Sequence, residues 1–130
     1  MRGVEGWGPI PYQWATTGYQ GAIGTGRTIC GFLFGGAIFL GYLSGKNATQ
    51  APEVKDEARK QAMSWVNDLF KGFIERFSTT DCQTLTGCDW SKEEDRNRYY
   101  KEEIYKDQCF RFCEYVLSNC LDRTASNEKL

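Results

Sequence analysis

The sequence has no histidine among its 130 residues. This absence excludes Ser–His and Cys–His catalytic pairs, a CxxCH haem attachment with its histidine ligand, and every zinc site that uses histidine. A bound metal would have to be held by thiolate, carboxylate or backbone oxygen. Base catalysis would depend on carboxylates, lysines or tyrosines, and the sequence singles out no pair of these.

The chain also lacks an excess of charge of either sign, since 16 Lys and Arg face 17 Asp and Glu for a net charge of −1. Nucleic-acid binding needs a basic surface, so we expect no nucleic-acid partner. Carboxylates and lysines are spread over predicted helix faces that meet solvent. An acid–base enzyme for a small organic substrate is therefore the least favoured class.

No export signal is visible, because the first residues lack a basic segment followed by an apolar one. We therefore expect a cytoplasmic protein with reduced thiols. The most apolar segment, residues 28–43, is shorter than the roughly 20 residues that span a bilayer as a helix. It predicts a buried, glycine-rich helix and makes membrane insertion the less favoured alternative.

Helical periodicity dominates the rest of the chain. Apolar residues recur every three or four positions after Pro52 as far as Phe77, which predicts a long helix, and residues 82–87 suit a short one. A last helix is predicted at about 98–123, preceded by a start signal in which Ser91 is the N-cap and Glu94 completes a capping box.

Glycine and proline are dense in residues 1–27, which predicts an irregular lead-in with one short helix around residues 12–19. Residues 124–130 are predicted to be a frayed polar tail. The fold class is therefore all-α: one domain over residues 1–130, a small bundle of four to five helices around a buried glycine-rich central helix.

Six cysteines are the only residues that mark out a chemistry, and no CxxC occurs among them: Cys30, Cys82, Cys88, Cys109, Cys113 and Cys120. Their number allows fifteen disulfide connectivities, and the sequence does not choose among these. The spacing of the last three places them on one helix face. Buried packing as small hydrophobic side chains is the favoured interpretation of Cys113 and Cys120.

The other cysteines occupy more suggestive positions. Cys30 precedes the apolar helix, where backbone N–H groups and the helix dipole would stabilise a thiolate and lower its pKa. Cys82 lies in the turn after the long helix and is expected to face a pocket. Cys88 either pairs with Cys82 or lies exposed.

A family resemblance follows from these motifs. The glycine-rich loop leading into Cys30-Gly31 and on to Gly35 resembles that of the C-GCAxxG-C-C family, which is described as redox-active and is related to a segment of split-Soret cytochromes. Residues 73–87, which contain Cys82, resemble its third cysteine motif, and Cys109 ahead of Tyr115-Val116 resembles its fourth. The resemblance covers residues 21–121. The first cysteine of the family has no counterpart here.

The resemblance implies that Cys30, Cys82 and Cys109 are the redox-active residues and that glycines of the loop and helix lie beside a cofactor. These glycines are Gly24, Gly26, Gly31 and Gly35.

Three interpretations stay open. In the first, Cys30, Cys82 and Cys109 bind an iron–sulfur cluster or, as the weaker choice, zinc, with Cys113 or Cys88 as a fourth ligand. In the second, Cys30 exchanges as a thiol–disulfide pair with Cys82 or Cys109 in electron transfer with a redox partner protein. In the third, the chain is a non-catalytic helical subunit or a homodimer with structural cysteines.

Overall fold

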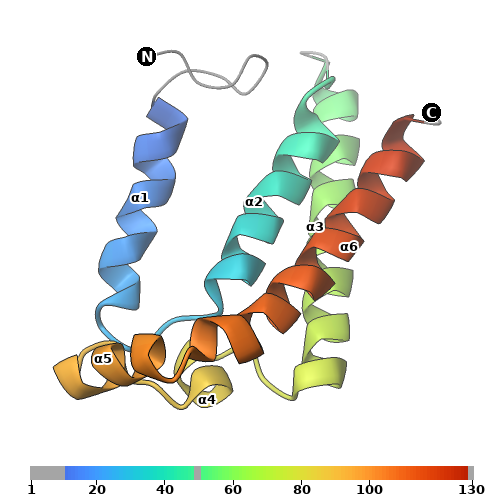
Figure 1. The fold of residues 1–130 in the computed structure, drawn as a ribbon. Helices are drawn as coiled ribbons and strands as arrows, with labels where there is room; N and C mark the ends of the chain where they lie inside the picture. Colours follow the sequence, from blue (N-terminus) through green and yellow to red (C-terminus); the bar gives the residue numbers. More distant parts are fainter. Residues whose placement is uncertain (1–10, 49–50, 129–130) are drawn as a thin grey trace.

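The computed structural model describes residues 11–48 and 51–128 (Figure 1). These residues form six α-helices and one π-helical turn: α1 (Pro11–Ile23), α2 (Gly31–Gly45), α3 (Pro52–Phe77), α4 (Cys82–Thr86), α5 (Glu93–Lys101), η1 (Tyr105–Cys109) and α6 (Phe110–Glu128). Helices α2, α3 and α6 pack together, α1 lies beyond α2, and α4 and α5 lie at one end of the bundle. The predicted all-α class is confirmed.

The lead-in is more regular than predicted, because α1 extends from Pro11 to Ile23. Pro11 occupies the first helical position, where its missing N–H is not needed. The ring of Tyr19 stacks on Phe34 of α2, with centroids 4.0 Å apart. Its hydroxyl donates to the carbonyl oxygen of Ile29 at 2.6 Å. These tertiary contacts offset the low helix propensity of the glycines in α1. The rest of the predicted lead-in, residues 1–10, lies outside the described residues.

Helix α2 is buried on one face only. Its buried side faces α3 and α6 and consists of Leu33, Gly36, Leu40 and Leu43. A Cβ at Gly36 would lie 2.7 Å from Cγ1 of Val116, so glycine permits the close approach of α2 to α6. The opposite face exposes Ile38 and Tyr42. The predicted burial of this segment is therefore correct for half of its surface.

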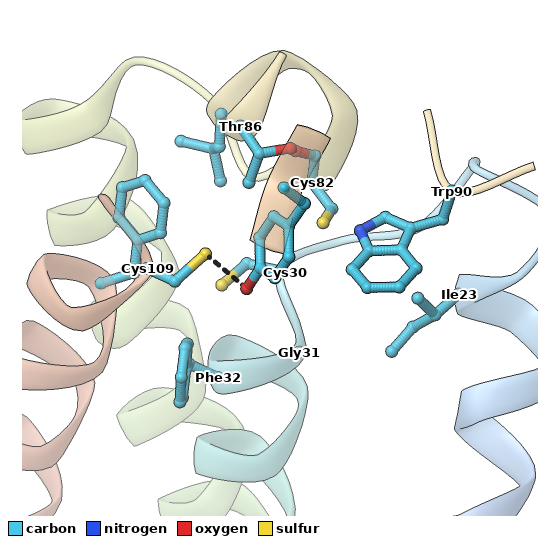
Figure 2. A pocket seen from close by; sticks show the side chains of 11 residues that line it. Ile23, Cys30, Gly31, Phe32, Cys82, Thr86, Trp90 and Cys109 are labelled. Carbon is cyan, nitrogen blue, oxygen red and sulfur yellow. Dashed lines mark hydrogen bonds between the residues drawn. The ribbon is translucent and has the colours of Figure 1, made fainter. Parts of the chain in front are cut away.

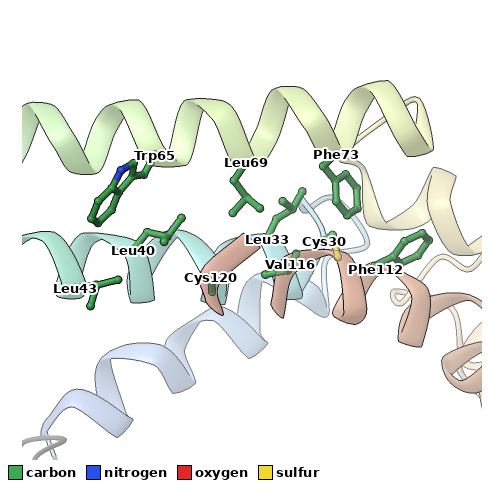
Figure 3. Close-up of a cluster of buried hydrophobic side chains, with 10 residues drawn as sticks. All are labelled: Cys30, Leu33, Leu40, Leu43, Trp65, Leu69, Phe73, Phe112, Val116 and Cys120. Carbon is green, nitrogen blue, oxygen red and sulfur yellow. The ribbon is translucent and has the colours of Figure 1, made fainter. Parts of the chain in front are cut away.

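The hydrophobic core lies between α2, α3 and α6 (Figure 3). From α3, Trp65, Leu69 and Phe73 point into it, which confirms the predicted periodicity of that helix. From α6, Phe112, Val116 and Cys120 complete it. None of the described helices is both long enough and apolar enough to cross a membrane.

The predicted single helix over residues 98–123 is wrong. Helix α5 ends at Lys101, Glu103 has a left-handed φ of 53°, and the chain resumes as η1 and then α6. The break lets Ile104 enter the protein interior, where 7% of its surface is exposed. Helix α6 then continues to Glu128, through most of the predicted polar tail, and residues 129–130 lie outside the described range.

The predicted capping box is also wrong. Helix α5 begins at Glu93 after Lys92, so Ser91 is not its N-cap. The Ser91 hydroxyl donates instead to Oδ1 of Asp89 at 2.6 Å and closes a turn before the helix. Local side-chain bonding to a preceding carboxylate has replaced the capping role.

Candidate functional site

Three cysteines from separate segments line one cavity of about 280 Å³ (Figure 2). Cys30 is the N-cap of α2, Cys82 is the first residue of α4, and Cys109 ends η1. The remaining lining residues are mostly apolar or aromatic: Ile23, Gly31, Phe32, Leu85, Thr86, Trp90, Tyr99 and Phe112. The cysteines that the family resemblance selected are thus brought to a common space.

An antiparallel β-bridge between Ile29 and Asp81 sets the relation of Cys30 to Cys82. The Cys30 N–H donates to the carbonyl of Thr80 at 2.7 Å, and the Cys82 N–H donates to the carbonyl of Thr28 at 2.9 Å. In this pattern both cysteines follow the bridged pair, so their side chains leave the same face of the bridge. Diagonal neighbours of this kind have Cα atoms about 7–8 Å apart. The two thiols are therefore close, although a long stretch of sequence separates them.

Caps hold the short helix α4 that carries Cys82. Oδ2 of Asp81 accepts from the N–H of Thr84 at 2.8 Å and from its hydroxyl at 2.6 Å. The Thr86 hydroxyl donates to the carbonyl of Cys82 at 2.8 Å. A helix of five residues is too short to be stable by itself, so these bonds determine where Cys82 lies.

The prediction that the Cys30 thiol has a lowered pKa is wrong. Burial raises its pKa, and the nearby Cys109 and Cys113 act in the same direction. The backbone N–H groups of Leu33 and Phe32 lower it, as expected at a helix start, but only in part. Only 5% of the Cys30 surface is exposed, and loss of hydration outweighs the helix terminus.

The other two cavity thiols are also harder to ionise than usual. Burial, helped by the neighbouring Cys30 and Cys109, raises the pKa of Cys82 from 9.0 to about 11. Burial also raises the pKa of Cys109, while the hydrogen bond from Tyr99 lowers it. All three cysteines therefore face the cavity as neutral thiols near pH 7.

Tyr99 is the residue of the site that the sequence analysis missed. Its hydroxyl donates to Sγ of Cys109 at 3.3 Å (Figure 2). The ring packs edge-on against Trp90, with centroids 5.1 Å apart, and lies 5.9 Å from that of Tyr105. Burial raises the pKa of the Tyr99 phenol, so it remains a donor. The adjacent pair Tyr99-Tyr100 was the only sequence signal for this role.

The remaining cysteines do not line the cavity. Cys88 has 1% of its surface exposed, and its N–H donates to the hydroxyl of Thr86 at 3.2 Å, so it is neither exposed nor paired with Cys82. Cys120 packs in the core, as predicted, and Cys113 is half-buried. All six cysteines are free thiols.

Comparison with known proteins identifies the family of the chain. The model of a family described as "Putative redox-active protein (C_GCAxxG_C_C)" matches residues 9–126. The chain belongs to the C_GCAxxG_C_C family. No curated protein and no solved structure matches it. In this member of the C_GCAxxG_C_C family, Cys30, Cys82 and Cys109 are the cysteines that share one cavity.

Only one of the four glycines predicted beside a cofactor lines the cavity of this C_GCAxxG_C_C protein, and that residue is Gly31. Gly26 serves the backbone, because its φ of 74° is left-handed and a Cβ there would collide with Asp89. A Cβ at Gly24 would lie 3.5 Å from the carbonyl of Gly21. At Gly35 a Cβ would meet no atom of the described chain within 4 Å.

The thiols do not form a ready ligand set for a metal. Among the described residues, no three Cys, Asp or Glu side chains are grouped so that they could hold a metal ion. Cys88 and Cys113, the predicted fourth ligands, lie outside the cavity lining. Binding of an iron–sulfur cluster or zinc therefore stays a prediction from the sequence.

Proposed function

We propose that this chain is a thiol–disulfide redox protein in which Cys30 and Cys82 are the exchanging pair. The observation that supports this most is the β-bridge that holds the two residues on one face, with both side chains lining the same cavity. Disulfides need Cα atoms within about 7 Å, which the bridge nearly provides. Formation of the bond would require the start of α2 or α4 to shift so that the sulfurs come within bonding range.

The exchange proceeds in two balanced steps. The Cys30 thiol loses its proton to solvent, and its thiolate attacks one sulfur of a substrate disulfide, which breaks the S–S bond and releases one thiolate. The deprotonated Cys82 then attacks the Cys30 sulfur of the mixed disulfide. This forms the Cys30–Cys82 bond and releases the second thiolate. The substrate gains two electrons, and the protein loses two.

Cys109 is a third thiol within reach of this pair. It lies near enough to contribute to the raised pKa of both Cys30 and Cys82, and it receives a side-chain hydrogen bond from Tyr99. We propose that Cys109 can replace Cys82 as the disulfide partner of Cys30. Binding of a partner protein or of a second copy of the chain stays a prediction.

The test is oxidation of the reduced protein with a small disulfide, followed by peptide mass spectrometry without reduction. We expect a linked peptide pair that contains Cys30 and Cys82. Cys30→Ser should abolish it, while Cys120→Ser, which changes a core thiol outside the cavity, should leave it unchanged. Oxidation that links no cavity cysteine would overturn the proposal.

A second measurement separates exchange from cluster chemistry. Protein purified without oxygen is assayed for iron and zinc per chain. If the protein contains iron near one cluster per chain and Cys30→Ser loses this iron, cluster binding would replace thiol exchange as the function. Metal far below one equivalent, together with the Cys30–Cys82 linkage, would support exchange.

A further inference from the structure

The cavity carries no formal charge. Of its eleven lining residues, all within the described part of the chain, none has a carboxylate, ammonium or guanidinium group. Its polar groups are the three thiols, the hydroxyls of Thr86 and Tyr99, and the indole N–H of Trp90. Four of the eleven lining residues are aromatic: Phe32, Trp90, Tyr99 and Phe112.

Charged side chains next to the cavity are engaged elsewhere. Nη1 of Arg96 donates to the carbonyl of Trp90 at 2.7 Å, and Nη2 of Arg98 donates to the carbonyl of Gly87. The Asp81 carboxylate, adjacent to Cys82, accepts from Thr84. These hydrogen bonds hold the three charged groups on the local backbone and side chains, and none of the three residues lines the cavity.

We infer that the substrate of this site is a small, uncharged, largely apolar molecule, and that charged disulfides are discriminated against. This inference rests on the proposed thiol exchange and names its substrate class. Moving an ionised group from water into an apolar space without a partner is costly, whereas an apolar or aromatic body gains from contact with the rings. A cavity of about 280 Å³ is at the lower end of ligand pockets and suits a molecule of one or two rings.

The experiment compares two aromatic disulfides of similar size. Dithiodipyridine is uncharged at pH 8, and dithiobis(nitrobenzoate) is a dianion. Each reacts with a protein thiolate to form a mixed disulfide and release one aromatic thiolate, which is followed by its absorbance. Mass spectrometry of quenched samples assigns the modification or subsequent linkage to Cys30, Cys82 or Cys109. Rates are divided by those of free cysteine with the same reagent.

We expect the normalised rate at the cavity cysteines to be at least about tenfold higher with the uncharged reagent. Ile23→Lys introduces a positive charge at the cavity lining and should narrow or reverse this preference. Ile23→Gln, a polar but neutral change at the same position, should not. Leu121→Lys adds the same charge on α6, at a residue that is 65% exposed, and should also leave the preference unchanged.

The outcomes separate this inference from the proposed function. Equal normalised rates for the two reagents would overturn the uncharged-substrate inference and leave thiol exchange in place. Failure of both reagents to modify or link any cavity cysteine would overturn thiol exchange itself. If Ile23→Lys does not fold, the comparison of the two reagents on the unmodified protein still tests the uncharged-substrate inference.

Discussion

The hydroxyl of Tyr99 donates to Sγ of Cys109 at 3.3 Å. Tyr99 lies on α5, before the interruption of the helix at Glu103, and Cys109 lies on the π-helical turn η1 after it. This bond lowers the pKa of Cys109 against the effect of burial. Tyr99 is therefore a positioning residue for the third cavity thiol.

Tyr99→Phe removes this donor and keeps the ring contacts with Trp90. Since hydrogen bonds to charged groups contribute about 1.5–3 kcal/mol, we expect alkylation of Cys109 at pH 8 to slow by about tenfold or more. Peptide mass spectrometry after timed alkylation measures the rate at each cysteine. Tyr105→Phe is the matched control, because that ring packs against Tyr99 but does not line the cavity. Unchanged Cys109 reactivity in Tyr99→Phe would contradict the assigned role.

The raised pKa of Cys82 predicts a loss of stability at alkaline pH. The unfolded chain releases this proton near the ordinary pKa of 9.0, whereas the folded protein holds it until about 11. The contribution of Cys82 to stability is thus fully present below pH 9 and is lost as the pH rises toward 11. Urea unfolding between pH 7 and pH 11 measures this decline. The unfolding free energy of Cys82→Ala should decline less steeply with pH over the upper part of that range. An identical slope of unfolding free energy against pH in the two proteins would contradict the prediction.

Two glycines of α2 should respond in opposite ways to alanine. At Gly36 a Cβ would lie 2.7 Å from Val116 and 3.2 Å from Leu69, so Gly36→Ala forces α2 away from α6 and α3. Overpacking of this kind costs about 1–3 kcal/mol of unfolding free energy. Gly35→Ala meets no described atom within 4 Å and should stabilise the helix by about 0.5–1 kcal/mol. Chemical denaturation measures both, and equal effects would be inconsistent with the close approach at Gly36.

Asp81→Ala removes the cap of α4. We expect a loss of about 1 kcal/mol of stability and faster alkylation of Cys82, because the first turn of α4 opens more often. Asp81→Ser keeps a capping oxygen and should restore most of both properties. Alkylation rates that are the same in all three proteins would show that the cap does not control access to Cys82.

Local patterns account for what the sequence predicted well. The apolar periodicity around Leu69 and Phe73 is repeated over many turns of α3, so the helix and its buried face follow from residues close together in the chain. The cysteine motifs likewise single out Cys30, Cys82 and Cys109, which line one cavity, while their redox role stays a prediction. The helix break at Glu103 is different, because burial of Ile104 by distant residues favours a left-handed residue that local propensity does not indicate.

The geometry of the site depends on long-range contacts. The bridge between Ile29 and Asp81 joins two short segments that carry no strand pattern, so the sequence does not reveal that Cys30 and Cys82 are neighbours. The direction of the pKa shift at Cys30 was wrong for a similar reason. The helix terminus is visible in the sequence, while the burial that outweighs it comes from the core that Cys30 shares with residues of α3 and α6.

The bridge also links oxidation of Cys30 and Cys82 to the stability of the whole bundle. A bond between Cys30 and Cys82 would close a covalent ring that contains all of α2 and α3, the two helices with the most extensive mutual contact. In the chain-entropy description, a ring of this size restricts the unfolded chain by about 4 kcal/mol. The oxidised protein would then melt at a higher temperature than the reduced one. The redox state of two cysteines in one small cavity would thus change the stability of the entire chain.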